Sequence, residues 1–188
     1  MINEAIRADL YRYSGESPSG KLLPALLIPG FRFMYIFRKA AEHPKKSIRG
    51  FLYRILLQFH SVVYGFQIPP STSIGKGLYI GHWGTIIVNG KTIIGANCNL
   101  SPGVTIGQTN RGNNKGVPII GSKVWIGTNA VVVGNVSIGD NVLIAPNSFV
   151  NISVPSNSLV VGNPATIVPK ENATDGYIDF IFDPDHHP

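Results

Sequence analysis

The stretch with the clearest chemical potential is "GHWGT", residues 81–85, where His82 and Trp83 stand together in a segment almost free of charge. An imidazole titrates near neutral pH, so a positioned histidine can take a proton from a weak nucleophile such as a hydroxyl group. An indole offers a large flat apolar face. We therefore take His82 as a candidate general base and Trp83 as a contact for a substrate or for a second protomer.

The single cysteine carries a weaker signal. Cys98 lies inside a regular repeat and has no histidine next to it in sequence, so we interpret it as structural rather than as an acyl-carrying nucleophile. One cysteine excludes an intramolecular disulfide and suits a reducing compartment. A zinc site of three histidines is not expected either, because the repeats supply only His82.

The composition limits the classes of protein further. Hydrophobic residues make up 44% of the 188 residues and charged residues 14%, which is typical of a packed globular protein. The net charge of +6 suits an anionic partner of some kind. No uncharged apolar run is long enough to span a membrane, and the N-terminal segment lacks the apolar core of a signal peptide.

Residues 1–65 predict helices that must support the histidine segment. In "GFRFMYIFRKAAEH" the residues Phe33, Ile36, Phe37 and Ala40 recur at helical intervals. In "SIRGFLYRILLQFHSVVYG" the same spacing recurs, with Ser47 as the N-cap. We interpret the mixture of arginine and aromatic residues as the solvated face of a helical bundle, with contact to a membrane surface as the alternative.

From Ile74 onward the period changes to six residues. Aliphatic residues followed by a small residue repeat through Ile80, Ile94, Ile106 and Ile120, and the phase then holds to Val150. Such a repeat predicts short strands separated by tight turns, with the aliphatic side chains in a narrow core. Three strands would form one coil of a triangular prism.

The period breaks twice. The step from Ile80 to Ile94 contains two extra residues, and His82 lies at this break. The step from Ile106 to Ile120 also contains two extra residues, and its polar sequence "GQTNRGNNKGVP" predicts a loop extruded at residues 108–118. Function is usually attached to the irregular parts of a solenoid, so both breaks are candidate sites.

The chain resembles the hexapeptide-repeat acyltransferases with a left-handed parallel β-helix, in particular serine acetyltransferases and their sugar-modifying relatives. The resemblance is carried by "GHWGTIIVNG", by the loop, by "VWIGTNAVVVGNVSIGDNVLIAPNSFV" and by "VVGNPATIV". It implies a mainly β fold with an N-terminal α-helical region, a homotrimer with active sites between protomers, and acetyl transfer from acetyl-CoA to a hydroxyl group. We expect a helical region at 1–65, a β-helix domain at 66–168 and a C-terminal tail at 169–188.

The resemblance also assigns roles to individual residues. It places His82 where the family has its general base and puts Gln67 in a supporting position. The residues that it implies for binding the coenzyme are Gly107, Arg111, Lys115, Trp125, Gly127, Thr128, Ala145 and Lys170. The cations among them are candidates for the coenzyme phosphates. No metal is implied.

Three positions depart from the pattern of serine acetyltransferases. Gln67 replaces the aspartate that supports the base, Gly81 replaces an aspartate that helps to hold serine, and Val117 replaces a second histidine. Because these polar groups suit an amino-acid substrate, their loss leads us to expect a different acceptor. We expect O-acetylation of a small-molecule or lipid-linked sugar in surface polysaccharide biosynthesis.

Two alternatives remain at this point: a serine O-acetyltransferase, and a noncatalytic trimeric scaffold. The protein is expected in the cytoplasm, either free or at the inner face of the membrane through its N-terminal helices. No nucleic-acid partner is expected.

Overall fold

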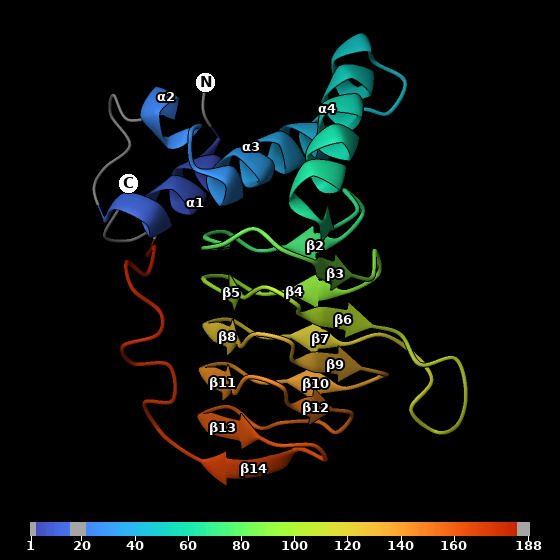
Figure 1. Cartoon of the computed structure of the whole chain (residues 1–188), viewed down its shortest axis with the longest axis vertical. Helices are drawn as coiled ribbons and strands as arrows, with labels where there is room; N and C mark the ends of the chain where they lie inside the picture. The colour runs from blue at the N-terminus through green and yellow to red at the C-terminus, as the bar shows by residue number, and fades with distance from the viewer. Residues whose placement is uncertain (1–2, 16–21, 184–188) are drawn as a thin grey trace.

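The fold is a stack of coils under a group of helices, as the computed structural model of residues 3–15 and 22–183 shows (Figure 1). The helices are α1 (Glu4–Ser14), α2 (Leu22–Ala25), α3 (Pro29–Glu42) and α4 (Ile48–Tyr64). The prediction that Ser47 caps the last helix is confirmed, because its hydroxyl accepts a hydrogen bond of 3.0 Å from the N–H of Gly50.

Three sheets form the faces of the prism, and each coil contributes a short segment to every face. Sheet A consists of β1 (Phe66–Gln67), β3 (Ile86–Val88), β6 (Thr105–Gly107), β9 (Val131–Val133) and β12 (Phe149–Val150). Sheet B consists of β2 (Ser73–Ile74), β4 (Ile93–Ile94), β7 (Ile119–Ile120) and β10 (Ser137–Ile138). Sheet C consists of β5 (Asn99–Leu100), β8 (Val124–Ile126), β11 (Val142–Ile144), β13 (Ser158–Val161) and β14 (Thr166–Pro169). Neighbouring strands pair in parallel except β14, which closes sheet C antiparallel to β13. The left-handed parallel β-helix with an N-terminal helical region is therefore confirmed.

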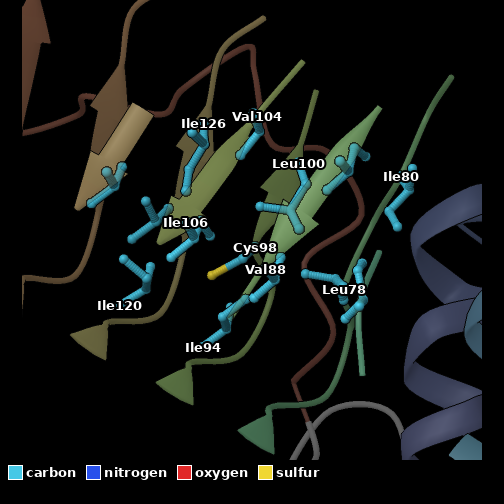
Figure 2. Close-up of a cluster of buried hydrophobic side chains, with 14 of the residues drawn as sticks. Leu78, Ile80, Val88, Ile94, Cys98, Leu100, Val104, Ile106, Ile120 and Ile126 are labelled. Carbon is cyan, nitrogen blue, oxygen red and sulfur yellow. The ribbon is translucent and has the colours of Figure 1, made fainter. Parts of the chain in front are cut away.

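The core of the prism is the row of aliphatic side chains that the period of six predicts. Ile94, Ile106 and Ile120 are at most 1% exposed, and Figure 2 shows them pointing into the space between the sheets together with Cys98. The thiol of Cys98 donates a hydrogen bond to the carbonyl of Gly121, and burial raises the pKa of this thiol to about 12. A buried, protonated thiol fits the structural interpretation of Cys98.

The two breaks in the period lie at different edges of the prism. The step from Ile80 to Val88 is two residues longer than the step from Leu100 to Ile106 in the next coil, and the extra length forms the turn that holds His82. This turn connects sheet C to sheet A, so we call the edge between these sheets the His82 edge. The extruded loop connects β6 to β7, and we call the edge between sheets A and B the loop edge.

A buried ion pair fastens the helices to the first coil. Asp9 of α1 is fully buried and accepts hydrogen bonds of 2.8 and 3.0 Å from Arg38 of α3, and it also accepts from the N–H groups of Gly77 and Leu78. Arg38 donates to the carbonyls of Ile74 and Gly75 as well. The sequence pattern suggested that Arg38 lies on a solvated face, whereas it is 8% exposed.

The apolar side of α4 is exposed, contrary to the simple helical-bundle interpretation. Only Leu57, Tyr64 and Gly50 of this helix are buried. The α4 apolar stripe consists of residues that are 44–81% exposed, namely Ile48, Phe51, Leu52, Ile55, Leu56, Phe59, Val62 and Val63. Its spacing keeps all eight on one side of the helix along its whole length.

The segment after β14 returns along sheet C toward the helices, and Figure 1 shows it running beside the whole stack. We call residues 170–183 the C-terminal strap. Asn97 exchanges two hydrogen bonds of 3.0 Å with the backbone of Phe182, and Asn141 accepts from the N–H and the hydroxyl of Thr174. Both asparagines occupy left-handed corners of the coils, with φ of 56° and 53°, a conformation that asparagine tolerates well. The corners of the prism thus anchor the strap.

Candidate active site

His82 opens onto a cavity of about 340 Å³ at the top of sheet C. The cavity is built from three distant parts of the chain: α1, the first three coils and the C-terminal strap. The lining residues that bear on its chemistry are Arg12, Tyr13, His82, Trp125, Tyr177 and Asp179. A hollow of this size holds a small polar molecule beside the imidazole.

The turn that carries His82 is held on both sides. Before it, the hydroxyl of the partly buried Tyr13 donates to the carbonyl of Ile80 at 3.0 Å and accepts from the N–H of Ile80 at 3.1 Å. After it, the N–H of Gly84 donates to the carbonyl of Tyr64 at 3.0 Å. Burial raises the pKa of Tyr13, so its hydroxyl keeps its proton for these contacts. The backbone around His82 is therefore fixed by α1 and by the end of α4.

Arg12 places a positive charge in the wall of this cavity. Its side chain is 3% exposed and donates to the carbonyl of Asp179 at 3.0 Å, to the carbonyl of Gly77 at 2.9 Å and to Oδ1 of Asn99 at 2.7 Å. All three acceptors are uncharged oxygens. Burial lowers the pKa of Arg12, but a guanidinium group remains protonated in proteins. No pattern in the sequence singled out this residue.

The C-terminal strap closes the cavity on the side away from the coils. The ring of Tyr177 packs edge-on against that of Trp125 at a centroid distance of 4.9 Å, and Nδ2 of Asn99 donates to the carbonyl of Tyr177. Phe180 lies over Gly15, where a Cβ atom would come within 2.4 Å of its ring. Gly15 is also in the left-handed region, with φ of 63°, so this close approach depends on glycine.

The structure does not bring Gln67 into this cavity. Gln67 lines a larger cavity of about 680 Å³ between α4 and sheet A, and no hydrogen bond joins it to His82 within the described residues. Trp83 is adjacent to His82 in sequence and is 68% exposed. Its contact with a substrate or with a second protomer stays a prediction.

The residues predicted to bind the coenzyme divide between two edges of the prism. Trp125 lies in sheet C, and Gly127, Thr128 and Ala145 follow sheet C strands at the His82 edge, below His82. Gly107, Arg111 and Lys115 lie at the loop edge, with both cations exposed, and Figure 1 shows the extruded loop on the side opposite the strap. Lys170 is exposed at the start of the strap. One copy of the chain therefore brings only part of this set close to His82.

The comparisons with known proteins agree with the fold. Residues 118–151 match the family model described as bacterial transferase hexapeptide (six repeats). A serine acetyltransferase of Helicobacter pylori is 33% identical over 146 residues, which cover 78% of this chain and 85% of that protein. The chain belongs to the hexapeptide-repeat transferase family.

Solved serine acetyltransferases share the fold of most of this chain. Serine acetyltransferase of Brucella abortus in complex with coenzyme A has a TM-score of 0.74 at 30% identity, and the match covers 88% of this chain and 67% of that one. Soybean serine acetyltransferase complexed with serine has a TM-score of 0.73 at 31% identity, covering 87% of this chain and 68% of that one. This hexapeptide-repeat transferase is an acetyl-CoA-dependent acyltransferase, with acetyl-CoA as its co-substrate.

The expectation of a sugar acceptor is wrong. The relatives found at this level of identity are serine acetyltransferases, including one of Staphylococcus aureus that is 39% identical over 123 residues, 65% of this chain and 58% of that protein. Positions 67, 81 and 117 lack the polar groups that led to this expectation. However, α1 and the strap place charged groups, Arg12 and Asp179, in the same cavity as His82. No helix in the described part of the chain is both long and apolar enough to cross a membrane.

Proposed function

We propose that this transferase moves an acetyl group from acetyl-CoA to the hydroxyl group of L-serine, with His82 as general base. The observation that carries the proposal is the position of His82 on the wall of a small polar cavity. That the relatives are serine acetyltransferases, one of them solved with serine, supports this acceptor. The chain has a single cysteine, which suits a reducing compartment, and this supports a cytoplasmic enzyme.

In the proposed reaction, a ring nitrogen of His82 takes the proton of the serine hydroxyl while the hydroxyl oxygen bonds to the thioester carbonyl carbon. Backbone N–H groups of the glycine-rich coils are the donors available to the carbonyl oxygen as it becomes negative. The carbon–sulfur bond then breaks, and the proton passes from the imidazole to the departing sulfur. The products are O-acetylserine and coenzyme A.

The coenzyme is proposed to lie along the His82 edge. Successive coils are about 4.8 Å apart, so the three steps from His82 to Ala145 span roughly 14 Å of this edge. An extended pantetheine arm follows such an edge, past Gly127 and Thr128.

The cations of the extruded loop are proposed to come from a second copy. Arg111 and Lys115 lie at the loop edge and His82 lies at another edge, so the loop of one chain completes the site of its neighbour. This arrangement is satisfied by a trimer of prisms with three equivalent sites. Lys170, at the start of the strap, is proposed as a further contact for the phosphates.

The α4 apolar stripe supports association with another copy. A row of exposed aliphatic and aromatic side chains along a helix of 17 residues is typical of a protein interface. Helices that lie on membranes are rich in lysine and arginine on their polar side. On α4 the basic residues are Arg49 and Arg54, and Arg54 is engaged by the carbonyls of Gly50 and His43. We therefore propose that a second copy, and not a lipid surface, covers the stripe.

Replacement of the base tests the reaction. His82→Ala should lower the rate of coenzyme A release with acetyl-CoA and L-serine by about 100 to 10,000-fold, the usual contribution of a general base. The control is His60→Ala, since His60 lies on α4 and its ring contacts Leu56, Phe59 and Tyr64 of the same helix. Full activity in His82→Ala would contradict the proposed base and favour a noncatalytic scaffold.

Replacement on the stripe tests the assembly. Phe59→Asp should lower the molar mass measured by light scattering from that of a trimer, because an aspartate buried in an apolar interface is unfavourable. Arg49→Asp also introduces a carboxylate on α4, at a position outside the stripe, and should leave the mass unchanged. If the wild type is a monomer that sediments with anionic lipid vesicles, the membrane interpretation replaces this proposal.

A further inference from the structure

The cavity beside His82 contains two opposite charges that come from opposite ends of the chain. Arg12 belongs to α1, and Asp179 belongs to the C-terminal strap. They line the cavity together with the imidazole of His82. The remaining ionisable side chains of the lining are tyrosines. Neither charged residue belongs to the repeat.

Arg12 is arranged to bind an anion in the cavity. The three oxygens that accept hydrogen bonds from it are two backbone carbonyls and one side-chain amide, so they orient the guanidinium without cancelling its charge. A cation that is 3% exposed lies in a medium where charge interactions are strong. The planar guanidinium suits a carboxylate ligand in particular.

Asp179 is arranged to bind a cation. Its carboxylate is exposed, whereas its backbone carbonyl is fixed by Arg12 at 3.0 Å. The residues on both sides are also held: the carbonyl of Tyr177 by Asn99, and the ring of Phe180 over Gly15. The strap thus presents the carboxylate from a defined backbone position on the cavity wall.

From this pairing we infer that Arg12 and Asp179 bind the two charged ends of an amino-acid acceptor, Arg12 its carboxylate and Asp179 its ammonium group. The inference rests on the proposed function and adds to it the groups that select the acceptor. The hydroxyl group of such a molecule then points to His82, which lines the same cavity. The strap is in this way a part of the acceptor site and not only a cover for sheet C.

Acceptors that lack one charge separate the two roles. L-Serine carries both charges, 3-hydroxypropionate lacks the ammonium group, and ethanolamine lacks the carboxylate. The experiment measures coenzyme A release from acetyl-CoA by the full chain and compares kcat/KM between acceptors within each variant. Such a ratio does not depend on the fraction of correctly folded enzyme.

Asp179→Asn should raise the KM for L-serine about tenfold or more and lower the preference for L-serine over 3-hydroxypropionate by a similar factor, since a charged hydrogen bond is lost. The matched control is Asp175→Asn, an exposed aspartate on the strap outside the cavity lining, which should change neither value. Arg12→Gln should lower the preference for L-serine over ethanolamine and leave the KM for acetyl-CoA unchanged.

Unchanged acceptor ratios in Asp179→Asn and Arg12→Gln, with serine turnover intact in the wild type, would overturn this inference alone. A wild-type enzyme that does not acetylate L-serine would overturn the proposed function and this inference together.

Discussion

At the residue scale, Tyr13 is the side chain that holds the turn before His82, the residue that we propose as the general base. Its hydroxyl contacts both the N–H and the carbonyl of Ile80, two positions before His82. Sequence alone could find His82, because the residue interrupts a strict period. It could not find Tyr13 or Arg12, because nothing in a short helix far from the repeat indicates which coil its side chains will meet.

Tyr13→Phe should lower the free energy of unfolding by about 1–3 kcal/mol, because both backbone groups of Ile80 lose their partner in a buried place. Acetyl transfer should also slow, with a fall in kcat larger than the change in the KM for acetyl-CoA. Chemical denaturation and steady-state kinetics measure the two effects. Tyr35→Phe removes a hydroxyl that has no hydrogen bond within the described residues, so it should change neither the free energy of unfolding nor the rate of acetyl transfer. Equal effects in both variants would argue against a positioning role for Tyr13.

At the element scale, the period of six is enough to predict the strands but not the helices' contacts. Hydrophobic spacing predicted α3 and α4 as helices, and both exist. The same spacing suggested a packed bundle, whereas α4 leaves its apolar stripe exposed and buries only Gly50, Leu57 and Tyr64. The division of the chain at residues 65 and 168 stays a prediction.

The attachment of α1 and α3 to the first coil depends on the ion pair between Asp9 and Arg38. Asp9→Asn leaves the buried guanidinium without its anion and should lower the free energy of unfolding by about 3–5 kcal/mol. Glu4→Gln on the same helix removes an exposed pair with Lys76 and should change it by less than about 1 kcal/mol. Similar losses in the two variants, measured by thermal or denaturant unfolding, would show that burial does not distinguish these pairs.

At the scale of the whole molecule, one hydrophobic core runs through the stacked coils, and the single thiol of the chain is buried in it. Cys98 is fully buried and its pKa is raised to about 12, so very little thiolate exists at pH 8. In the native protein a disulfide reagent should therefore label Cys98 only as fast as the protein unfolds. In the urea-unfolded protein the labelling should be immediate. Fast labelling without denaturant would indicate local opening of the second coil. The slow reaction also leaves the released coenzyme A as the only thiol in an activity assay.

The C-terminal strap changes how a stack of coils can come apart. In an ordinary solenoid each repeat touches only its neighbours, so the terminal coil frays first and unwinding proceeds from the end. Here Arg12 and Asp179 are 167 positions apart in sequence and are hydrogen-bonded, while Asn97 holds Phe182 across 85 positions. The last coil cannot unwind without pulling the strap from the first helix. The chain is thus closed into a ring by non-covalent contacts, and removal of α1 or of the strap should loosen the pocket that contains the histidine.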